Sequence, residues 1–489
     1  MRILIFHGYL LRGTGSNIYN AELVRALARL GHEVHLFCQD PDWEAPEGVT
    51  VHVPDIGRVL PVYVADSYDG FDAKVYPDLT DAELEHYIEA NVEAVRAAPV
   101  PDAALANHAI MGPLVLARGL AGRAPYAVKV HGSALEYTVR PNQERFLPLA
   151  LEGIGGASGV LVGSGYTAGS LWELLAADTG LRDRTRLGPP GVDIHTFNPS
   201  KGYDIEALAS KLERQGTGAW GGEAGAADAL RSLDPERDRI VSYVGKLIVS
   251  KGLDLLFAAW PFVVGRVPDA TLCVIGFGAY RDTLTRFQEA LRRRDVDDLL
   301  DIAARGRELE GGPRSELRYL RAFLERVDDD WLAAAPAAAE RIHFTGRLEH
   351  DDLPLVLPAF DAQVMPSTFP EAFGMVAAEA AACGVLPLSA NHSGMAEVTA
   401  TLAPALPDHL RPLLHFDVGD DAVDQIGSKL VRWLELDPAE QDQARGLLAQ
   451  RAAERYSWES VAESVIAAAQ GRLDGLPHPA PPGDNVPAS

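Results

Sequence analysis

The stretch from Phe360 to Ser389 constrains the fold of this chain more than any other. A strand-like run, Phe360 to Met365, is followed by a short loop, an alanine-rich helix expected from about Phe373 to Cys383, and a second apolar run from Val385 to Ser389. Apolar runs on both sides of a helix predict a βαβ unit of a parallel sheet. Such a unit presents the free N–H groups of the helix N-terminus at the carboxyl edge of the sheet, where open α/β sheets bind ligands and anions are favoured.

Two acidic residues near the start of this helix leave two interpretations open. Glu371 lies in the loop and Glu379 lies further along the helix. In the first interpretation the helix end receives a phosphate, while the two carboxylates accept hydrogen bonds from sugar hydroxyls. In the second, Glu371 is a helix-start acid favoured by the helix dipole and Glu379 is a solvated residue. The stretch alone does not separate the two, so the rest of the chain has to decide.

Apolar runs and helical segments alternate along the rest of the chain, and this alternation predicts an α/β fold. A chain of 489 residues is long enough for several domains. We therefore expect two doubly wound, Rossmann-like domains whose sheets face each other across a cleft with their carboxyl edges. The expected strands are residues 2–6, 32–37, 102–107, 126–130 and 159–163 in the first domain, and 239–244, 270–275, 341–345 and 360–365 in the second.

A Pro/Gly break at Gly188–Asp193 marks the expected boundary between the domains. Two regions after this boundary are longer than the connections between strands of a sheet require, and we expect them to be helical insertions. The expected parts are an N-terminal domain at residues 1–198, a C-terminal domain at 199–456 with insertions at about 201–237 and 280–340, a C-terminal helix at 457–475, and a Pro-rich, disordered tail at 476–489.

Composition and charge narrow the class of partner. The chain is 47% hydrophobic and 23% charged, as soluble globular proteins are, and no run approaches the ~18 apolar residues of a membrane span. Met1–His7 lacks a following cleavage pattern, so we expect a cytoplasmic protein. Cys38, Cys273 and Cys383 are isolated and odd in number, which argues against disulfides or a zinc cluster. A net charge of −25 disfavours nucleic acid and anionic lipid surfaces, so any phosphate site must be built locally.

Two lysines around a turn are candidates for such a local site. Lys246 and Lys251 follow the predicted strand at 239–244. A P-loop is disfavoured because Leu247, not Ser or Thr, follows Lys246. Alone, Lys251 would more often be an exposed surface lysine. Opposite a helix N-terminus, two ammonium groups could neutralise a pyrophosphate leaving group without a metal, and no paired acids of Mg²⁺-site type accompany them.

His131 and a glycine loop are the candidates in the N-terminal domain. His131 ends a predicted strand next to Gly132, where backbone can approach a substrate closely, although a lone histidine is more often structural. His108 holds a similar position one strand earlier and is less favoured. Gly13-Thr14-Gly15 lacks the third glycine of a dinucleotide fingerprint, so we read it as a loop at the sheet edge that a ligand could approach closely.

In this order, the motifs resemble those of the retaining nucleotide-sugar glycosyltransferases of family 4, which have two Rossmann-like domains in the GT-B architecture. The resemblance covers most of the chain, and the acidic pair in its Phe-Pro-Glu-Ala-Phe-Gly context is its most specific part. The matching motifs are Gly13-Thr-Gly15, His131-Gly132, Pro190-Gly-Val-Asp193, Gly245-Lys246 with Lys251-Gly252, Glu371-x7-Glu379 and Glu454-Arg-Tyr-Ser-Trp458.

The resemblance implies a role for each matching position. Lys246 and Lys251 would hold the donor diphosphate, with Lys246 standing where the family more often has arginine, so that a point charge replaces a bidentate fork. Glu371 would lie by the hydroxyls of the transferred sugar, and the helix after Trp458 would cross back to the first domain. The other implied positions are Phe373, Gly374, Met375 and Val376 at sugar and phosphate, Glu379 at the ribose, Arg347 and Leu348 at the base, Gly15 at the diphosphate, and His131 at the donor sugar and the reacting centre.

The resemblance also implies a reaction. A glycosyl group would pass from a nucleoside diphosphate sugar to an acceptor hydroxyl with retention of configuration, the acceptor binding on the N-terminal side and the departing phosphate helping to deprotonate it. No metal or other cofactor is expected. The alternatives are a nucleotide-sugar epimerase, a glycosyl phosphorylase with lysine-bound pyridoxal phosphate, and a non-catalytic nucleotide-sugar-binding protein.

Overall fold

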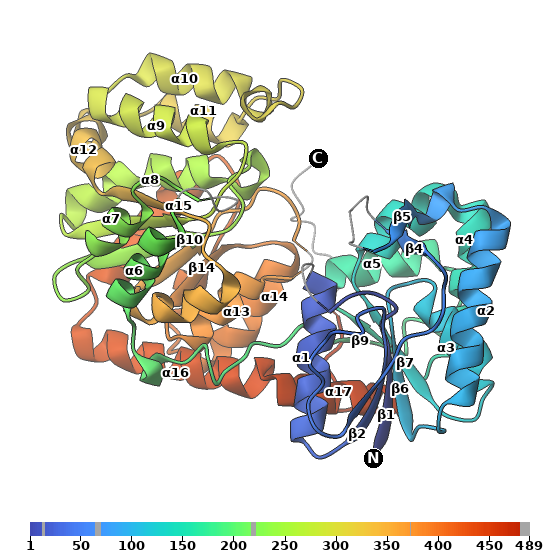
Figure 1. Cartoon of the computed structure of the whole chain (residues 1–489). Coiled ribbons are helices and arrows are strands. Elements are labelled where there is room, and N and C mark those ends of the chain that lie inside the picture. The colour runs from blue at the N-terminus through green and yellow to red at the C-terminus, as the bar shows by residue number, and fades with distance from the viewer. Residues whose placement is uncertain (12–14, 64–69, 217–221, 372, 480–489) are drawn as a thin grey trace. The chain divides into compact units, whose positions relative to one another are not determined.

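The computed structural model describes residues 1–11, 15–63, 70–216, 222–371 and 373–479, and these residues divide into two compact units. Unit 1 comprises Met1–Gly191 together with the segment from Tyr456 onward, and unit 2 comprises Val192–Arg455. Each unit is an α/β unit built on a parallel sheet (Figure 1), which confirms the predicted fold class.

The sheet of unit 1 has the strand order β3-β2-β1-β6-β7-β8-β9, and every pairing in it is parallel. Leu4 and Phe6 of β1 pack in one hydrophobic cluster and Ile3 and Ile5 in another, because successive side chains of a strand point to opposite faces. Both faces are therefore covered, which explains the continuous apolar runs. The strands are β1 (Arg2–Phe6), β2 (Glu33–Phe37), β3 (Val49–His52), β6 (Ala103–Asn107), β7 (Tyr126–Val130), β8 (Gly159–Val162) and β9 (Thr185–Leu187), with a separate pair β4 (Val59–Val62) and β5 (Asp72–Val75).

Helices cover both faces of this sheet (Figure 1). One cluster contains residues of α1 and of α17, so the C-terminal helix packs in unit 1. The other cluster contains residues of α2 to α5. Helix α2 begins at a capping box, in which Thr80 and Glu83 bond each other's backbone N–H. The helices are α1 (Gly15–Arg29), α2 (Asp81–Ala97), α3 (Gly112–Leu120), α4 (Gln143–Gly155), α5 (Gly165–Leu174) and α17 (Trp458–Ala469).

The sheet of unit 2 has the order β12-β11-β10-β13-β14-β15, again entirely parallel. Its strands are short and almost wholly buried, as in a sheet covered on both faces. The strands are β10 (Arg239–Val244), β11 (Ala270–Ile275), β12 (Ile342–Gly346), β13 (Ala362–Met365), β14 (Leu386–Ala390) and β15 (His415–Phe416), and the helices outside the insertions are α8 (Leu253–Arg266), α13 (Met375–Ala382), α14 (Ser393–Leu402), α15 (Ala422–Leu434) and α16 (Pro438–Tyr456).

Both predicted insertions contain helices. The first holds α6 (Ile205–Gln215) and α7 (Ala226–Arg231), and α7 packs beside the edge strand β12. The second places α12 against α8, where Trp331 Nε1 donates to the Ala258 carbonyl at 2.8 Å. Its helices are α9 (Arg281–Arg293), α10 (Val296–Arg305), α11 (Arg318–Leu324) and α12 (Asp329–Glu340).

The order of the strands reverses once in each sheet. In unit 1 the reversal lies between β1 and β6, and in unit 2 it lies between β10 and β13. At such a point the loops that follow the two central strands turn away in opposite directions, and ligands of open α/β sheets bind in the crevice between them. These two points are therefore where the fold places a binding site in each unit.

Candidate functional site

The loops at the reversal point of unit 2 carry the predicted lysines and the first glutamate. Lys251 follows β10 and Glu371 follows β13. Their side chains form an ion pair, and each is about one-quarter exposed, at 28% and 24%. A pair that is half-buried in this way is held in one geometry and remains open to a ligand. The structure thus brings together two residues that are far apart in the chain.

Two side chains, Ser367 and Ser393, bond Glu371 directly, and His392 supports Ser367. Ser367 Oγ donates to Glu371 Oε1 at 2.9 Å. The backbone N–H of Glu371 donates to Ser393 Oγ at 2.8 Å, and its carbonyl accepts from the Gly394 N–H at 3.0 Å. His392 Nε2 lies 2.8 Å from the Ser367 carbonyl. Glu371 is therefore fixed at both backbone and side chain, although the sequence singled out none of these partners.

The two loops meet backbone to backbone. The Thr368 N–H donates to the Ser250 carbonyl at 2.9 Å. Gly252 has φ of +65°, and a Cβ built on it would lie 2.0 Å from the Pro366 carbonyl oxygen. Only glycine fits this left-handed, close position without a shift of the backbone. The glycine after Lys251 thus explains how the lysine loop can approach the glutamate loop.

Lys246 lies in the same loop but makes no ion pair in the described part of the chain. Its side chain is exposed, and its carbonyl accepts from the Tyr243 hydroxyl at 2.8 Å. The loop rests on Gly276, where a Cβ would lie 1.9 Å from the Gly245 carbonyl oxygen. Burial and the nearby Glu371 carboxylate raise the pKa of the Tyr243 hydroxyl, which stays a neutral donor.

The second insertion reaches this loop through one acidic side chain. Glu310 Oε2 accepts from the backbone N–H of Val249 at 2.7 Å. The Glu310 side chain is only 10% exposed, and Arg307 Nε lies 3.2 Å from its other oxygen. The contact spans a long stretch of chain, which is why no local sequence pattern pointed to Glu310.

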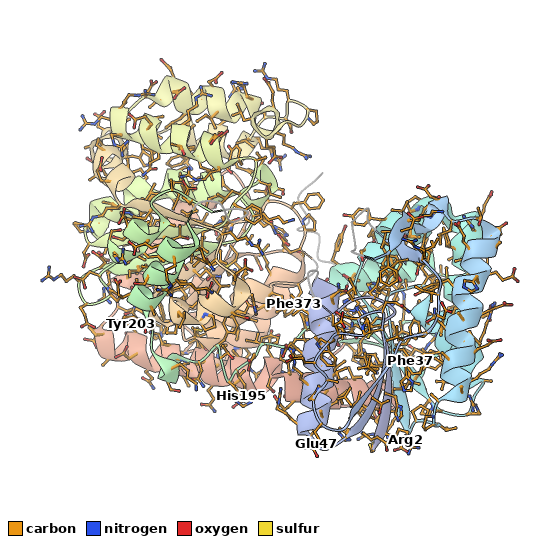
Figure 2. All side chains as sticks on the ribbon, viewed as in Figure 1. Arg2, Phe37, Glu47, His195, Tyr203 and Phe373 are labelled. Atoms are coloured by element: carbon orange, nitrogen blue, oxygen red, sulfur yellow. The ribbon has the colours of Figure 1, made fainter. Side chains whose placement is uncertain are left out.

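Helix α13 starts beside Glu371. It was predicted to begin at Phe373, but the structure has Phe373 and Gly374 before the helix and Met375 as its first residue. No side chain caps the start of the helix at Gly374, and the N–H groups of its first two residues, Met375 and Val376, have no acceptor within the helix. Phe373 is labelled in Figure 2, on the segment of unit 2 that leads into α13. A helix start of this kind is suited to an anion.

Glu379 is not the solvated residue that the second interpretation supposed. It is buried at 4% exposure, and its Oε1 lies 2.9 Å from His350 Nε2. A buried carboxylate needs a partner, and His350 supplies it from the segment after β12. His350 in turn lies beside Phe197, at 5.1 Å between ring centroids. That interpretation is therefore wrong for Glu379, whose burial suits a hydrogen-bonding role.

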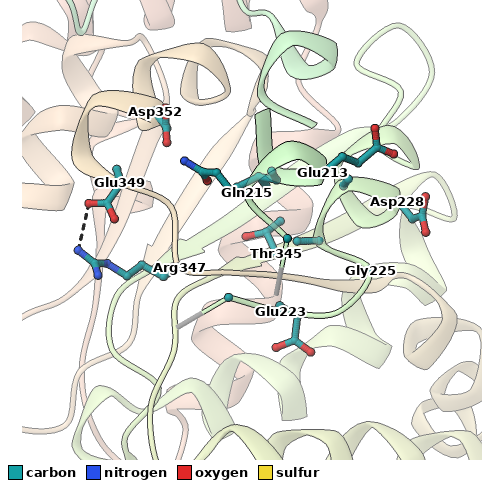
Figure 3. Close-up of a pocket in the computed structure, with 14 residues that line it drawn as sticks. Glu213, Gln215, Glu223, Gly225, Asp228, Thr345, Arg347, Glu349 and Asp352 are labelled. Atoms are coloured by element: carbon teal, nitrogen blue, oxygen red, sulfur yellow. Dashed lines mark hydrogen bonds and ion pairs between the residues drawn. The ribbon is translucent and has the colours of Figure 1, made fainter. Parts of the chain in front are cut away.

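Arg347 and Leu348, expected to border the base, follow the edge strand β12. Arg347 pairs with Glu349 at 3.0 Å and its guanidinium lies 5.8 Å from the Phe277 ring centroid, whereas Leu348 is buried. Beside Arg347 a pocket of about 200 Å³ opens toward the first insertion (Figure 3). Its lining includes Thr345, Arg347, Glu349 and Asp352 on one side and Glu213, Gln215, Glu223, Gly225 and Asp228 on the other.

The reversal point of unit 1 carries His131, together with side chains that the sequence did not single out. His131 is half-buried, and its Nε2 lies 2.8 Å from Asn107 Oδ1 at the end of β6. Its ring meets the Tyr19 ring edge-on at 5.1 Å. Burial, with smaller contributions from His108, Lys129 and His7, lowers the pKa of His131 well below its usual value. The imidazole is therefore neutral at physiological pH.

His108 and Gly15 complete the predictions for unit 1. His108 has φ of +69° and is 2% exposed, and neither ring nitrogen has a hydrogen-bond partner in the described structure. A buried histidine with a positive φ and no described hydrogen-bond partner is uncommon. Gly15 is the first residue of α1, and a Cβ there would meet nothing within 4 Å. Gly13 and Thr14 lie outside the described residues.

No group of three or more His, Cys, Asp or Glu side chains in the described residues is arranged to hold a metal ion. No described helix is both long enough and apolar enough to cross a membrane.

Two protein families match the chain. The glycosyl transferase 4-like domain matches residues 14–182, in unit 1, and the glycosyl transferases group 1 family matches residues 332–403, in unit 2. The second match includes Arg347, Glu371 and Glu379. The matched regions include one strand of each reversal point, β6 in unit 1 and β13 in unit 2.

Curated relatives carry glycosyltransferase names. A D-inositol 3-phosphate glycosyltransferase of Xylanimonas cellulosilytica is 28% identical over 397 residues, which cover 78% of this chain and 77% of the relative. A GDP-mannose-dependent monoacylated alpha-(1-6)-phosphatidylinositol monomannoside mannosyltransferase of Corynebacterium glutamicum is 27% identical over 224 residues, 45% of this chain and 41% of the relative.

Solved structures support the same fold. Anabaena HepE, in complex with UDP and glucose, matches with a TM-score of 0.54 at 18% identity, covering 97% of this chain and 100% of HepE. Sucrose-phosphate synthase of Thermosynechococcus elongatus matches with a TM-score of 0.53 at 20% identity, covering 96% and 98%. At this identity they establish the architecture alone. The chain therefore contains a glycosyl transferase 4-like domain and a glycosyl transferases group 1 domain, within the GT-B fold of the solved glycosyltransferases.

Proposed function

We propose that this glycosyltransferase moves a sugar from a nucleoside diphosphate sugar to an acceptor hydroxyl and retains the anomeric configuration. The observation that carries the proposal is the Lys251–Glu371 ion pair at the reversal point of the unit 2 sheet, beside the start of α13. An ammonium and a helix N-terminus match a diphosphate, and a fixed carboxylate matches sugar hydroxyls. One compact site thus offers partners for both halves of such a donor.

We propose that Lys246, Lys251 and the first-turn N–H groups of α13 together stabilise the leaving diphosphate. The negative charge grows on the diphosphate as the glycosidic C–O bond breaks, so preorganised donors lower the barrier at that moment. The positive charges of the two lysines can neutralise the diphosphate without a bound metal. Activity that survives complete chelation of divalent ions would agree with this assignment, and activity restored only by added Mg²⁺ would contradict it.

We propose that bond breaking and bond formation take place on the same face of the sugar. The bond between the anomeric carbon and the diphosphate oxygen breaks, and the acceptor oxygen forms its bond on that face. The acceptor proton passes to the departing phosphate oxygen. His131 is neutral and is proposed to contact the donor sugar by hydrogen bonding; it does not serve as a general acid.

The names of the relatives narrow the candidates to test. One relative is named for D-inositol 3-phosphate, another for GDP-mannose, and one neighbouring structure holds UDP and glucose. We therefore propose a UDP- or GDP-linked hexose as donor and a cyclitol or cyclitol-bearing hydroxyl as acceptor. We further propose a cytoplasmic location, because all three cysteines are free and buried, as in a reducing compartment.

The first experiment is a binding screen on the full chain. UDP, GDP and their hexose conjugates are titrated by calorimetry against the wild-type protein, Lys251→Ala, Glu371→Ala and Lys429→Ala. Lys429 is a half-buried lysine of the same unit that donates to the His415 carbonyl, so its variant controls for the loss of a lysine. We expect one nucleotide class to bind the wild type and the control alike, and Lys251→Ala to lose affinity for the diphosphate. Equal nucleotide affinity of all four proteins would contradict the assignment of the donor site to Lys251 and Glu371.

Three alternatives predict other results in the same preparation. An epimerase would convert the sugar of the donor with no acceptor present. A phosphorylase would need inorganic phosphate and show the absorbance of lysine-bound pyridoxal phosphate. A non-catalytic binding protein would bind the donor and release no nucleoside diphosphate with any acceptor.

A further inference from the structure

A chain of hydrogen bonds runs beneath His131 and links it to His7. His131 Nε2 lies 2.8 Å from Asn107 Oδ1, and Asn107 Nδ2 lies 2.7 Å from Asn20 Oδ1. Asn20 Nδ2 in turn lies 3.0 Å from His7 Nδ1. Asn107, Asn20 and His7 are all buried, so water does not compete for these bonds. The four residues come from α1 and from the ends of β1, β6 and β7, around the reversal point of unit 1.

Backbone carbonyls fix the direction of every bond in this chain, because a carbonyl oxygen can only accept. The Asn107 amide lies 3.1 Å from the Phe6 carbonyl, so its nitrogen faces Phe6 and its oxygen faces His131. The Asn20 amide nitrogen lies 2.8 Å from the Ser16 carbonyl, which orients Asn20 in the same way.

The far end of the chain is fixed by a third carbonyl. His7 Nε2 lies 3.0 Å from the Leu10 carbonyl, so Nε2 carries the proton of His7. His7 Nδ1 is then the acceptor that the Asn20 amide nitrogen requires. Neither amide can flip without placing an oxygen against a carbonyl oxygen, so the network has a single consistent arrangement.

The arrangement determines the tautomer of the histidine at the surface of the site. Asn107 Oδ1 can only accept, so His131 Nε2 must donate and carries the proton. We infer that Asn107 and Asn20 are positioning residues that hold His131 as the neutral Nε2–H tautomer and leave its Nδ1 as a hydrogen-bond acceptor. A side chain held in this way accepts a hydrogen bond from a substrate hydroxyl and cannot donate one to a phosphate or carboxylate through Nδ1.

The surroundings of His131 agree with a neutral ring. The titratable groups that face it are the Tyr19 ring, His108, with centroids 4.9 Å apart, and the more distant His7 and Lys129. No described carboxylate forms an ion pair with His131. The tautomer assignment does not depend on the proposed function, whereas the contact of Nδ1 with a substrate hydroxyl rests on it.

The test is long-range ¹H–¹⁵N correlation NMR of the histidines in the full chain, with His131→Gln identifying the resonances. We expect the wild-type spectrum near neutral pH to show His131 as the Nε2–H tautomer. Asn107→Leu removes the acceptor at similar volume and is expected to produce a mixture of tautomers. Asn91→Leu is the matched control, because Asn91 is equally buried and its amide nitrogen donates to the Tyr87 carbonyl of its own helix.

Activity supplies the second measurement. Asn107→Leu should lower kcat/KM by about 10- to 100-fold, as loss of an orienting partner commonly does, while Asn91→Leu stays near the wild type. A wild-type Nδ1–H tautomer, an imidazolium, or a His131 tautomer unchanged in Asn107→Leu would overturn the inference. If Asn107→Leu does not fold, the wild-type spectrum decides alone. Normal activity of His131→Ala would instead contradict the proposed role of His131 and leave the tautomer assignment standing.

Discussion

At the scale of single residues, Lys251 and Glu371 act as one unit. Each holds the other in place in the free protein, and each is proposed to meet a different half of the donor. We expect Lys251→Ala and Glu371→Ala each to lower kcat by about 10²- to 10³-fold, as the removal of one preorganised charged contact does. The double variant should cost little more than the worse single variant, because touching residues are not additive.

Steady-state kinetics of the wild type, the two single variants and the double variant measure the coupling between Lys251 and Glu371. Thermal unfolding of the same proteins controls for stability. We expect little change, because a partly exposed ion pair contributes little to the free energy of unfolding. Losses that add fully in the double variant would show that the two side chains act independently, contrary to the geometry described for them.

Sequence reasoning reached these two residues because their type and order are distinctive, whereas it missed their supports. Ser367 and Ser393 are ordinary residues that bond Glu371, and His392 bonds Ser367; these contacts exist only once β13 and β14 lie side by side. The same holds for Asn107 and His7 beneath His131. A pattern along the chain can therefore identify a charged group at a loop, but the tertiary fold determines what orients it.

At the scale of elements, the second insertion is expected to support the lysine loop. Glu310→Leu leaves the Val249 N–H without its acceptor, at a cost of about 1–3 kcal/mol for a buried donor, and should raise KM for the donor more than it lowers kcat. Glu310→Gln keeps an acceptor oxygen and should stay near the wild type. Glu308→Leu is the control, because Glu308 lies on the same turn and pairs with the neighbouring Arg305. Unchanged KM in Glu310→Leu, measured by steady-state kinetics, would show that the insertion has another role.

Periodicity predicted most helices and strands because both sheets are buried on both faces and their strands read as continuous apolar runs. It misplaced the start of α13, because Phe373 and Gly374 are apolar or small and carry no capping side chain that marks the boundary. It also could not show that α7 lies beside β12, since that contact joins an insertion to an edge strand.

At the scale of the whole molecule, unit 1 should lose stability in mild acid. Burial lowers the pKa of His7 to about 4 from a usual value of 6.5. Between these values the unfolded chain binds a proton that the folded chain does not, so stability falls as the pH drops through this window. The slope is about 1.4 kcal/mol per pH unit for each such group.

Urea unfolding of the full chain at pH 7 and pH 5 measures this effect, with the two units followed as separate transitions. His7→Gln should reduce the difference between the two pH values for unit 1. His86→Gln, which changes an exposed histidine of the same unit, should not. A wild-type protein that is equally stable at both pH values would contradict the buried, neutral state of His7.

The division of the chain was harder to read from sequence than its fold class. Gly188–Asp193 marked the break, and the structure divides after Gly191, where a Cβ would lie 2.4 Å from the Trp458 ring. Trp458 also contacts Tyr19, with ring centroids 5.4 Å apart, so the C-terminal helix completes the core of unit 1. A contact between the two ends of the chain has no local signal; only the resemblance of Glu454–Trp458 to a family motif pointed to it.

The central claim is that this chain transfers a sugar from a nucleotide donor with retention at the Lys251–Glu371 site. The most direct test is ¹H NMR of the anomeric proton while the full chain is incubated with UDP- and GDP-hexoses and a panel of cyclitol acceptors. We expect one donor to yield a glycoside with the anomeric configuration of the donor and an equal amount of nucleoside diphosphate, and Glu371→Ala to abolish both signals. A product of inverted configuration, or undiminished transfer by Glu371→Ala, would contradict the claim.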